Sequence, residues 1–294
     1  MNTKITKLIV IFGVVSMSTS SIFGKMVSAP AMVSAMYRMM FTALLLLPVV
    51  IWKHRAELCR ADRKSLLSCV LSGVFLGIHF TAYLESLKYT RIASSTVLVD
   101  TEVLFVALVL LFFFREKIPK AGLLGIAVTM AGGIVIALGD TSGGTHIIYG
   151  DMMAILGALC SSVYTLIGRN QRKYLSTTVY TFLVYASAAV TLFLASVVTG
   201  QAMTGYPLSD FAYIAAMVIF CTLLGHSIFS WGLKYISAAF ISLVKLGEPV
   251  CATIMGIFLF SEIPQGNQII GGLIVIGGIA MYLFAKENNH VHQG

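Results

Sequence analysis

The sequence predicts an all-α membrane protein with ten transmembrane helices, arranged as two inverted repeats of five helices. Three observations predict this fold class. The 294 residues are 58% hydrophobic and only 11% charged, whereas about 25% of the residues of an average soluble domain are charged. Ten apolar stretches are long enough to cross the roughly 30 Å hydrocarbon core of a bilayer as helices. The second half of the chain also repeats residue patterns of the first half, which indicates a duplication.

The ten predicted helices follow one another closely along the chain. The longest connection, residues 52–64, is too short for a separate soluble domain. The chain is therefore expected to lie almost entirely in the membrane. Apolar windows of about 19 residues locate the helices, which are expected over residues 5–25, 31–51, 65–87, 92–114, 121–138, 148–168, 179–199, 211–233, 238–260 and 268–285.

The basic residues predict how the chain is oriented. If the spans alternate, one side of the membrane carries most of the lysines and arginines, and the other side carries only Lys25, Lys88 and Arg91. The positive-inside bias places the basic side, with both termini, in the cytoplasm. We therefore expect a multi-pass protein of the cytoplasmic (inner) cell membrane. Its net charge of +8 is then explained by topology and by contact with membrane lipids, and no nucleic-acid partner is expected.

A shift of 146 residues aligns the two halves of the chain. Residues 86–119 then lie over residues 232–265, the triplet LKY recurs, and Glu102 coincides with Glu248. Because each copy contains an odd number of spans, the second copy must cross the membrane upside down. Inverted repeats of this kind are typical of secondary transporters, whose binding site lies near the membrane midplane. The predicted boundaries are 1–140 for the first repeat, 147–287 for the second, and 288–294 for a flexible tail.

Three stretches carry a resemblance to a known family. The pattern LKY followed by SAAFISLVKLGEPVCATIMGIFLFSE, together with SSIFGK and YRMMFTALLLLP in the first half, resembles the EamA-type branch of the drug/metabolite transporter (DMT) superfamily. The resemblance implies ten helices in two inverted repeats, a central cavity lined by helices 1, 3, 4, 6, 8 and 9, and export or exchange of small metabolites by alternating access. It does not specify a substrate, since relatives handle amino acids, nucleobases, amines, sugars and sugar conjugates. Val103 departs from the pattern, because the family usually has proline there, as at Pro249.

Ionisable residues within the predicted spans are candidates for function, because each costs roughly 2.5 to 3.5 kcal/mol at the centre of a helix on insertion scales. In the span 238–260, Lys245 and Glu248 are three residues apart and share one helix face. Pro249 follows them, lacks an N–H, and is expected to kink the helix and act as a hinge. The sequence therefore predicts that Lys245 and Glu248 contribute to a polar substrate site.

The corresponding span of the first half contains Asp100 and Glu102. A carboxyl group at mid-depth that lacks an ion-pair partner is readily protonated and can carry a proton across the membrane. Glu102 is our first candidate for proton coupling, and Asp100 is the second and also a candidate substrate contact. An alternative is a purely structural network, in which Lys245 neutralises Glu248 while Arg38 neutralises Glu102 or Asp100.

Histidine and aromatic residues complete the predicted cavity. Transmembrane histidines can relay protons, although a lone histidine more often forms a hydrogen bond between helices. Aromatic rings can enclose a cationic group. Arg38 is expected to be structural, because its helix is peripheral in the family that the sequence resembles. The remaining predicted substrate contacts are His79, Tyr83, Tyr164, His226 and Trp231.

These features favour a secondary active transporter, exporter or exchanger, of a small organic metabolite. A site with both acids and a lysine suits an amino acid or similar zwitterion, and proton coupling through Glu102 is possible within such a site. The alternatives are transport of an organic cation or amine, and a flippase for a lipid-linked metabolite. An enzyme is not expected, since neither an H-E-x-x-H pattern nor paired aspartate motifs occur. The lack of a P-loop argues against transport driven by ATP. No cofactor or metal is expected, and the protein should act as a monomer or weak homodimer.

Overall fold

The computed structural model describes residues 3–112, 118–139, 145–225, 228 and 247–291. Within these ranges all regular structure is helical, which confirms the all-α fold class. The first half contains α1 (Thr3–Met26), α2 (Ala31–Lys53), the short α3 (Arg55–Arg60), α4 (Arg63–Tyr89), α5 (Ile92–Asp100), α6 (Glu102–Phe112) and α7 (Lys120–Gly139). The second half contains α8 (Thr145–Gln171), α9 (Thr177–Val198), α10 (Leu208–Ala216), the π-helix η2 (Met217–Gly225), α13 (Glu248–Phe260) and α14 (Gly266–Val291).

The described helices fall where the apolar stretches predicted them. Seven helical segments are long and apolar enough to cross a membrane, and three shorter apolar helices cover 120–136, 248–260 and 266–282. The seven segments support a multi-pass membrane protein. The number of ten spans and the inversion of the repeats remain predictions. The last helix, α14, continues to Val291, into the segment for which a tail was expected.

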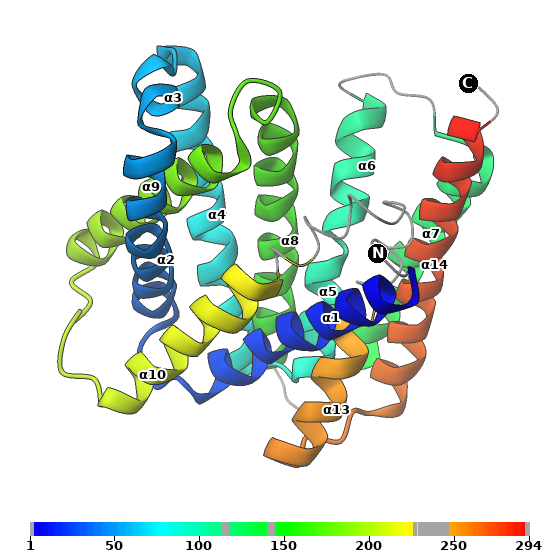
Figure 1. The fold of residues 1–294 in the computed structure, drawn as a ribbon. Helices are drawn as coiled ribbons and strands as arrows, with labels where there is room; N and C mark the ends of the chain where they lie inside the picture. The colour runs from blue at the N-terminus through cyan, green and yellow to red at the C-terminus, as the bar shows by residue number, and fades with distance from the viewer. Residues whose placement is uncertain (1–2, 113–117, 140–144, 226–227, 229–246, 292–294) are drawn as a thin grey trace.

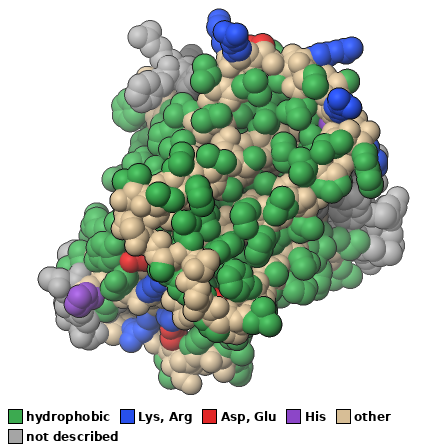
Figure 2. Space-filling model, turned by 90° about the vertical axis from the view of Figure 1, so that its left-hand side faces the viewer, with side chains coloured by type: hydrophobic (Ala, Val, Ile, Leu, Met, Phe, Trp, Pro, Cys, Tyr) green, Lys and Arg blue, Asp and Glu red, His purple; other side chains and the backbone are tan. Residues whose placement is uncertain are grey.

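The surface has the distribution expected for a protein surrounded by lipid. Figure 2 shows a broad hydrophobic face, with lysine and arginine side chains gathered toward its two ends. Large apolar side chains such as Phe258 and Val198 are more than four-fifths exposed. In water, an apolar surface of this extent would be strongly unfavourable. The bilayer interior is the solvent that accommodates it.

Helices α7 and α14 lie side by side at one edge of the molecule (Figure 1) and pack through glycines. A Cβ atom added to Gly125 would lie 2.7 Å from the carbonyl oxygen of Gly278, and one added to Gly132 would lie 2.8 Å from that of Gly271. Such distances are too short for any side chain. The backbones can approach this closely only because small residues line the interface, which is the usual basis of helix packing in membranes.

Several contacts between helices of the two halves have counterparts in which the equivalent helices have exchanged places. Helix α8 packs against α4, α5 and α6, and α1 correspondingly packs against η2 and α13. The pairs α2 with α9 and α7 with α14 each join equivalent helices of the two halves. Figure 1 shows α1 crossing the lower part of the molecule obliquely, next to α10 and α13. The first helix of each half thus packs mainly against the other half.

The predicted span 92–114 is interrupted at mid-length. Helix α5 ends at Asp100, Thr101 forms a turn, and α6 begins at Glu102. The amide of Thr101 bonds to the carbonyl oxygen of Leu98 at 3.2 Å, a spacing of three residues that tightens the helix. Irregular backbone at membrane depth is tolerated where it is enclosed by protein or lines a cavity. This interruption places Glu102 in the first turn of a new helix.

Candidate functional site

Glu102 joins the two halves of the molecule. Its carboxylate accepts hydrogen bonds from the hydroxyls of Ser161, at 2.7 Å, and Thr165, at 2.6 Å, both on α8. Ser161 is buried whereas Thr165 is exposed, so the carboxylate lies between the core and an open surface. Both hydroxyls donate to it, and hydrogen bonds to a carboxylate are stronger than those between neutral groups. The predicted proton-coupling residue therefore holds α6 against α8.

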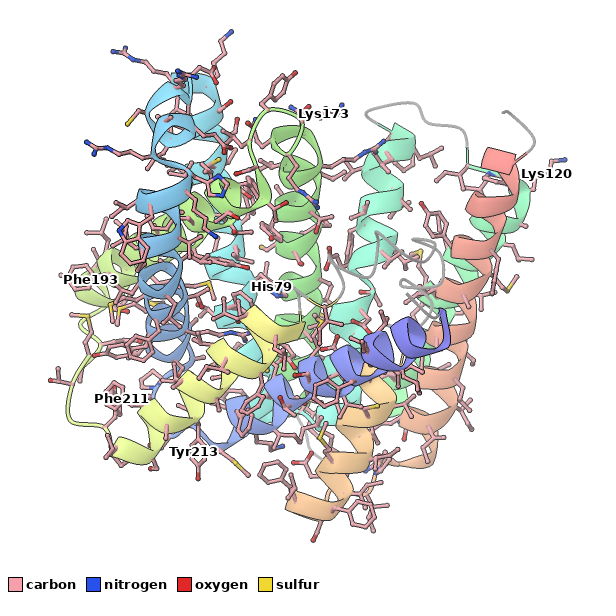
Figure 3. All side chains as sticks on the ribbon, viewed as in Figure 1. His79, Lys120, Lys173, Phe193, Phe211 and Tyr213 are labelled. Atoms are coloured by element: carbon pink, nitrogen blue, oxygen red, sulfur yellow. The ribbon has the colours of Figure 1, made fainter. Side chains whose placement is uncertain are left out.

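His79 lies at mid-height between α4 and α8 (Figure 3). Its Nδ1 is 2.9 Å from the carbonyl oxygen of Gly157. A carbonyl can only accept, so Nδ1 carries the proton, and Nε2 of the neutral ring remains an acceptor. The ring is parallel to that of Tyr83 with centroids 6.4 Å apart, and the imidazole interacts electrostatically with Glu102. The helix-to-helix hydrogen bond considered from sequence is therefore present.

Arg38 is buried, with only 3% of its surface exposed. It donates to Thr222 Oγ1 from Nε at 3.3 Å and from Nη2 at 3.2 Å, and to Ser20 Oγ from Nη1 at 3.0 Å. Its guanidinium carbon lies 4.2 Å from the ring centroid of Phe80. Among the described residues no carboxylate lies within ion-pairing distance of it. The suggested pairing of Arg38 with Glu102 or Asp100 is therefore not formed.

The hydroxyl of Thr222 connects Arg38 to the π-helix η2. It accepts twice from the guanidinium and lies 3.4 Å from the carbonyl oxygen of Met217, five residues earlier. Short π-helical segments occur frequently at functional sites. Nothing in the apolar residues 217–225 distinguishes them from an ordinary transmembrane helix, so the sequence analysis did not identify this irregularity.

Three tyrosines gather beside Arg38 and Glu102. Tyr83 on α4 and Tyr185 on α9 are 6% and 7% exposed, and both interact electrostatically with Arg38. Tyr164 on α8 is half-buried, stacks on Tyr180 with centroids 6.4 Å apart, and interacts with both Tyr185 and Glu102. Tyr83 and Tyr164 were predicted, whereas Tyr185 was missed. The only signal for Tyr185 was a tyrosine at the centre of an apolar span.

In the second half, the segment equivalent to the start of α6 begins α13. Glu248 is its first residue, and the backbone carbonyl of Glu248 accepts a hydrogen bond from Ser18 on α1 at 3.1 Å. Its side chain is within electrostatic reach of Arg38 and Tyr83. Pro249 is buried in the first turn of α13, where its missing N–H leaves no intrahelical bond unmade. The proposed kink would involve residues on its N-terminal side that are not described, so the hinge stays a prediction.

Asp100 ends α5, is half-buried, and interacts electrostatically with Tyr83. It thus lies near the same group of side chains. Three other predicted substrate contacts, Lys245, His226 and Trp231, lie outside the described residues. In the described part of the chain, no three histidine, cysteine or acidic side chains are close enough together to hold a metal ion.

Comparison with known proteins places the sequence in a family. The EamA-like transporter family matches twice, over residues 4–138 and 148–284. An uncharacterized transporter of Clostridium kluyveri is 25% identical over 92% of this chain and 91% of its own length. The uncharacterized transporters YetK and YyaM of Bacillus subtilis are 26% and 28% identical, covering 92% and 84% of this chain and 84% and 82% of their own lengths.

One crystal structure superimposes with a TM-score of 0.65, covering 97% of this chain and 99% of its own, at 19% sequence identity. That likeness shows a common fold. The two family matches, one in each half, together span most of the chain. The apolar helices of the described residues agree with them. The protein is therefore a multi-pass membrane protein that belongs to the EamA-like transporter family.

Proposed function

We propose that this protein is a secondary active transporter of a small organic metabolite, specifically an amino acid or a similar zwitterion. It works by alternating access in the cytoplasmic membrane, and Glu102 couples transport to protons. Membership of the family supports the transport of a solute. Acidic side chains, a buried arginine and tyrosines lie between the two halves. This combination supports a substrate that carries both a positive and a negative charge.

The observation that carries the proposal is the link from Glu102 to Ser161 and Thr165 across the two halves. A carboxylate can accept from both hydroxyls at once. A protonated carboxyl group is uncharged, and one of its oxygens becomes a hydrogen-bond donor. It therefore binds the two hydroxyls less strongly than the carboxylate does. Protonation of Glu102 therefore weakens the contact between α6 and α8. Weakening this contact lets the two halves move relative to each other, which couples proton binding to that movement.

His79 provides a second group for the proton. The imidazole interacts electrostatically with Glu102. When Nδ1 donates to the carbonyl oxygen of Gly157, Nε2 can accept a proton. An imidazole can take up a proton at one ring nitrogen and release one from the other, which suits a relay. In this proposal a proton passes between His79 and Glu102 while substrate is bound beside Tyr83 and Tyr164.

The orientation also belongs to this proposal. Lys120 and Lys173 lie at the same end of the molecule (Figure 3), and we assign that end and both termini to the cytoplasm by the positive-inside bias. The two moving units are the predicted repeats, residues 1–140 and 147–287. Helices α1 and α8 each pack mainly against the opposite half, so they connect the two units.

The test is transport by the purified full chain in proteoliposomes. Vesicles loaded with one unlabelled amino acid are given the same amino acid in labelled form, across a panel of neutral, acidic and basic members. Saturable counterflow that is accelerated by an imposed pH gradient supports the proposal. Counterflow of primary amines but not of amino acids would favour an organic-cation transporter, and movement of labelled lipid headgroups alone would favour a flippase.

A further inference from the structure

The buried charge of Arg38 is neutralised by no described carboxylate. Its three hydrogen bonds go to the uncharged hydroxyls of Ser20 and Thr222 and its face lies on Phe80. A guanidinium has five N–H donors and is permanently charged. Of these donors, Arg38 uses three on described residues. Burying such a group is unfavourable unless an anion or further acceptors complete its environment.

Two further donors lie within electrostatic reach of it. Tyr83 and Tyr185 are more than nine-tenths buried and both interact electrostatically with Arg38. Neither hydroxyl forms a hydrogen bond with another described residue, unlike Tyr180, which is paired with Ser72 at 2.8 Å. Buried tyrosine hydroxyls normally have a partner. Arg38 on α2 and the hydroxyls of Tyr83 on α4 and Tyr185 on α9 are thus three donor groups to which no described carboxylate is directly bonded.

We propose that Arg38, Tyr83 and Tyr185 form the subsite that binds the carboxylate of the transported molecule. The inference rests on the proposed transport function and assigns Arg38 a role beyond the structural one that the sequence suggested. Arginine can hold both oxygens of a carboxylate in a planar fork, and a tyrosine hydroxyl can donate to each oxygen. The three groups are enclosed in this state, so a ligand reaches them when the halves separate.

Glu248 favours a monoanion that also carries a cationic group over a dianion. Glu248 lies within electrostatic reach of both Arg38 and Tyr83. A dianion such as a phosphate monoester would be repelled by this carboxylate, whereas an ammonium group would be attracted to it. In this proposal an α-amino acid binds with its carboxylate toward Arg38 and its ammonium group on the side of Glu248.

The test measures binding to the purified protein with four probes of similar size: leucine, leucinamide, 4-methylpentanoate and isoamylamine. Leucine and 4-methylpentanoate have the carboxylate, and the other two lack it. Binding is measured by ligand-induced thermal stabilisation, since a ligand that binds the folded form raises its melting temperature. The variants are Arg38→Lys, Tyr83→Phe and Tyr185→Phe. Tyr180→Phe is the matched control, because Tyr180 lies on the same helix as Tyr185 and its hydroxyl already has a partner.

The wild type should bind the two carboxylate probes more tightly than their partners. Each subsite variant should weaken binding of the carboxylate probes by about tenfold or more, with little change for leucinamide and isoamylamine. Tyr180→Phe should keep the wild-type preference. Equal losses for all four probes, or an unchanged preference in the tyrosine variants, would overturn the proposal. So would a preference that is lost in Lys245→Ala but kept in Arg38→Lys.

Measurements on the same protein preparations distinguish failure of the proposed subsite from failure of the proposed transport function. If wild-type vesicles show counterflow but no preference for carboxylates, the subsite is wrong and the transport function stands. If the wild type binds carboxylates through Arg38 yet moves no solute, the transport function is wrong and the subsite stands. Arg38→Lys keeps the positive charge, so a fold that needs only that charge is preserved and binding can still be measured.

Discussion

Glu102 and Glu248 each form the first residue of a helix, and they are equivalent positions of the two repeats. Proline follows Glu248, but Val103 follows Glu102. The first-half helix nevertheless begins at the same place. The positive end of the helix dipole favours a carboxylate there. The glutamate, more than the proline, therefore marks the start of the second helical segment in both halves.

Replacing Glu102 with glutamine should abolish uptake driven by a pH gradient while substrate exchange remains measurable. Glutamine is similar in size and can still bond to Ser161, but it cannot take up or release a proton. The measurement is uptake and counterflow of a labelled substrate in proteoliposomes, with and without a pH gradient. Accumulation that still responds to the gradient in Glu102→Gln would remove Glu102 from the coupling role.

Adding a methyl group at Gly132 should destabilise the protein, whereas adding one at the neighbouring Gly133 should not. A Cβ atom at Gly132 would lie 2.8 Å from the carbonyl oxygen of Gly271, but at Gly133 its nearest neighbour is Leu98 at 3.8 Å. Overpacking lowers the stability of a protein by about 1 to 3 kcal/mol. Where there is room, replacing glycine with alanine stabilises a helix by up to about 1 kcal/mol. Thermal unfolding in detergent measures both variants. A Gly132→Ala protein as stable as Gly133→Ala would contradict the close packing of α7 and α14.

Breaking the ion pair between Lys25 and Glu262 should weaken the contact of α1 with α13 and α5. Glu262 also accepts a hydrogen bond from the amide of Ile92 at 3.1 Å, in the first turn of α5. Lys25→Met and Glu262→Gln should each lower the melting temperature. The double variant should lose less than the sum of the two, with a coupling of about 1 kcal/mol. Strictly additive losses would show that the pair contributes nothing.

Acidification should loosen the contact between α3 and α9 through Glu57. Slight burial raises the pKa of this carboxyl, but hydrogen bonds from the backbone and hydroxyl of Ser176 and from His54 outweigh it and lower the pKa overall. Because the pKa is lowered in the folded state, the ionised Glu57 stabilises the fold at pH values above the unfolded pKa of about 4.3. This stabilisation is lost as the pH falls through the folded pKa.

The check is the melting temperature of wild type and Glu57→Gln between neutral pH and about pH 3.5. The variant should be less stable at neutral pH, because an amide binds the Ser176 amide less strongly than a carboxylate does. The difference between the two proteins should shrink as the pH falls. A constant difference at all pH values would show that the charge of Glu57 has no part in the contact.

The sequence predicted the helices well because long apolar runs in a membrane protein have few alternatives to a helix. Glu102, His79, Tyr83 and Tyr164, which the sequence singled out as site candidates, lie near one another on α4, α6 and α8, and their roles stay predictions. Each belongs to a span where a polar or aromatic side chain is conspicuous. The π-helix η2 could not be predicted, because its apolar residues fit an α-helix equally well.

The order of residues alone determined that the chain is helical, spans a membrane and consists of two related halves, because hydropathy and repetition are properties of the linear chain. Tertiary structure decided the surroundings of Arg38. Its hydrogen-bond partner Thr222 is 184 positions away, and Tyr185 comes from yet another helix. Such neighbours follow only from how helices pack, since packing in lipid depends on the shape and small residues of whole helix faces and not on any local pattern.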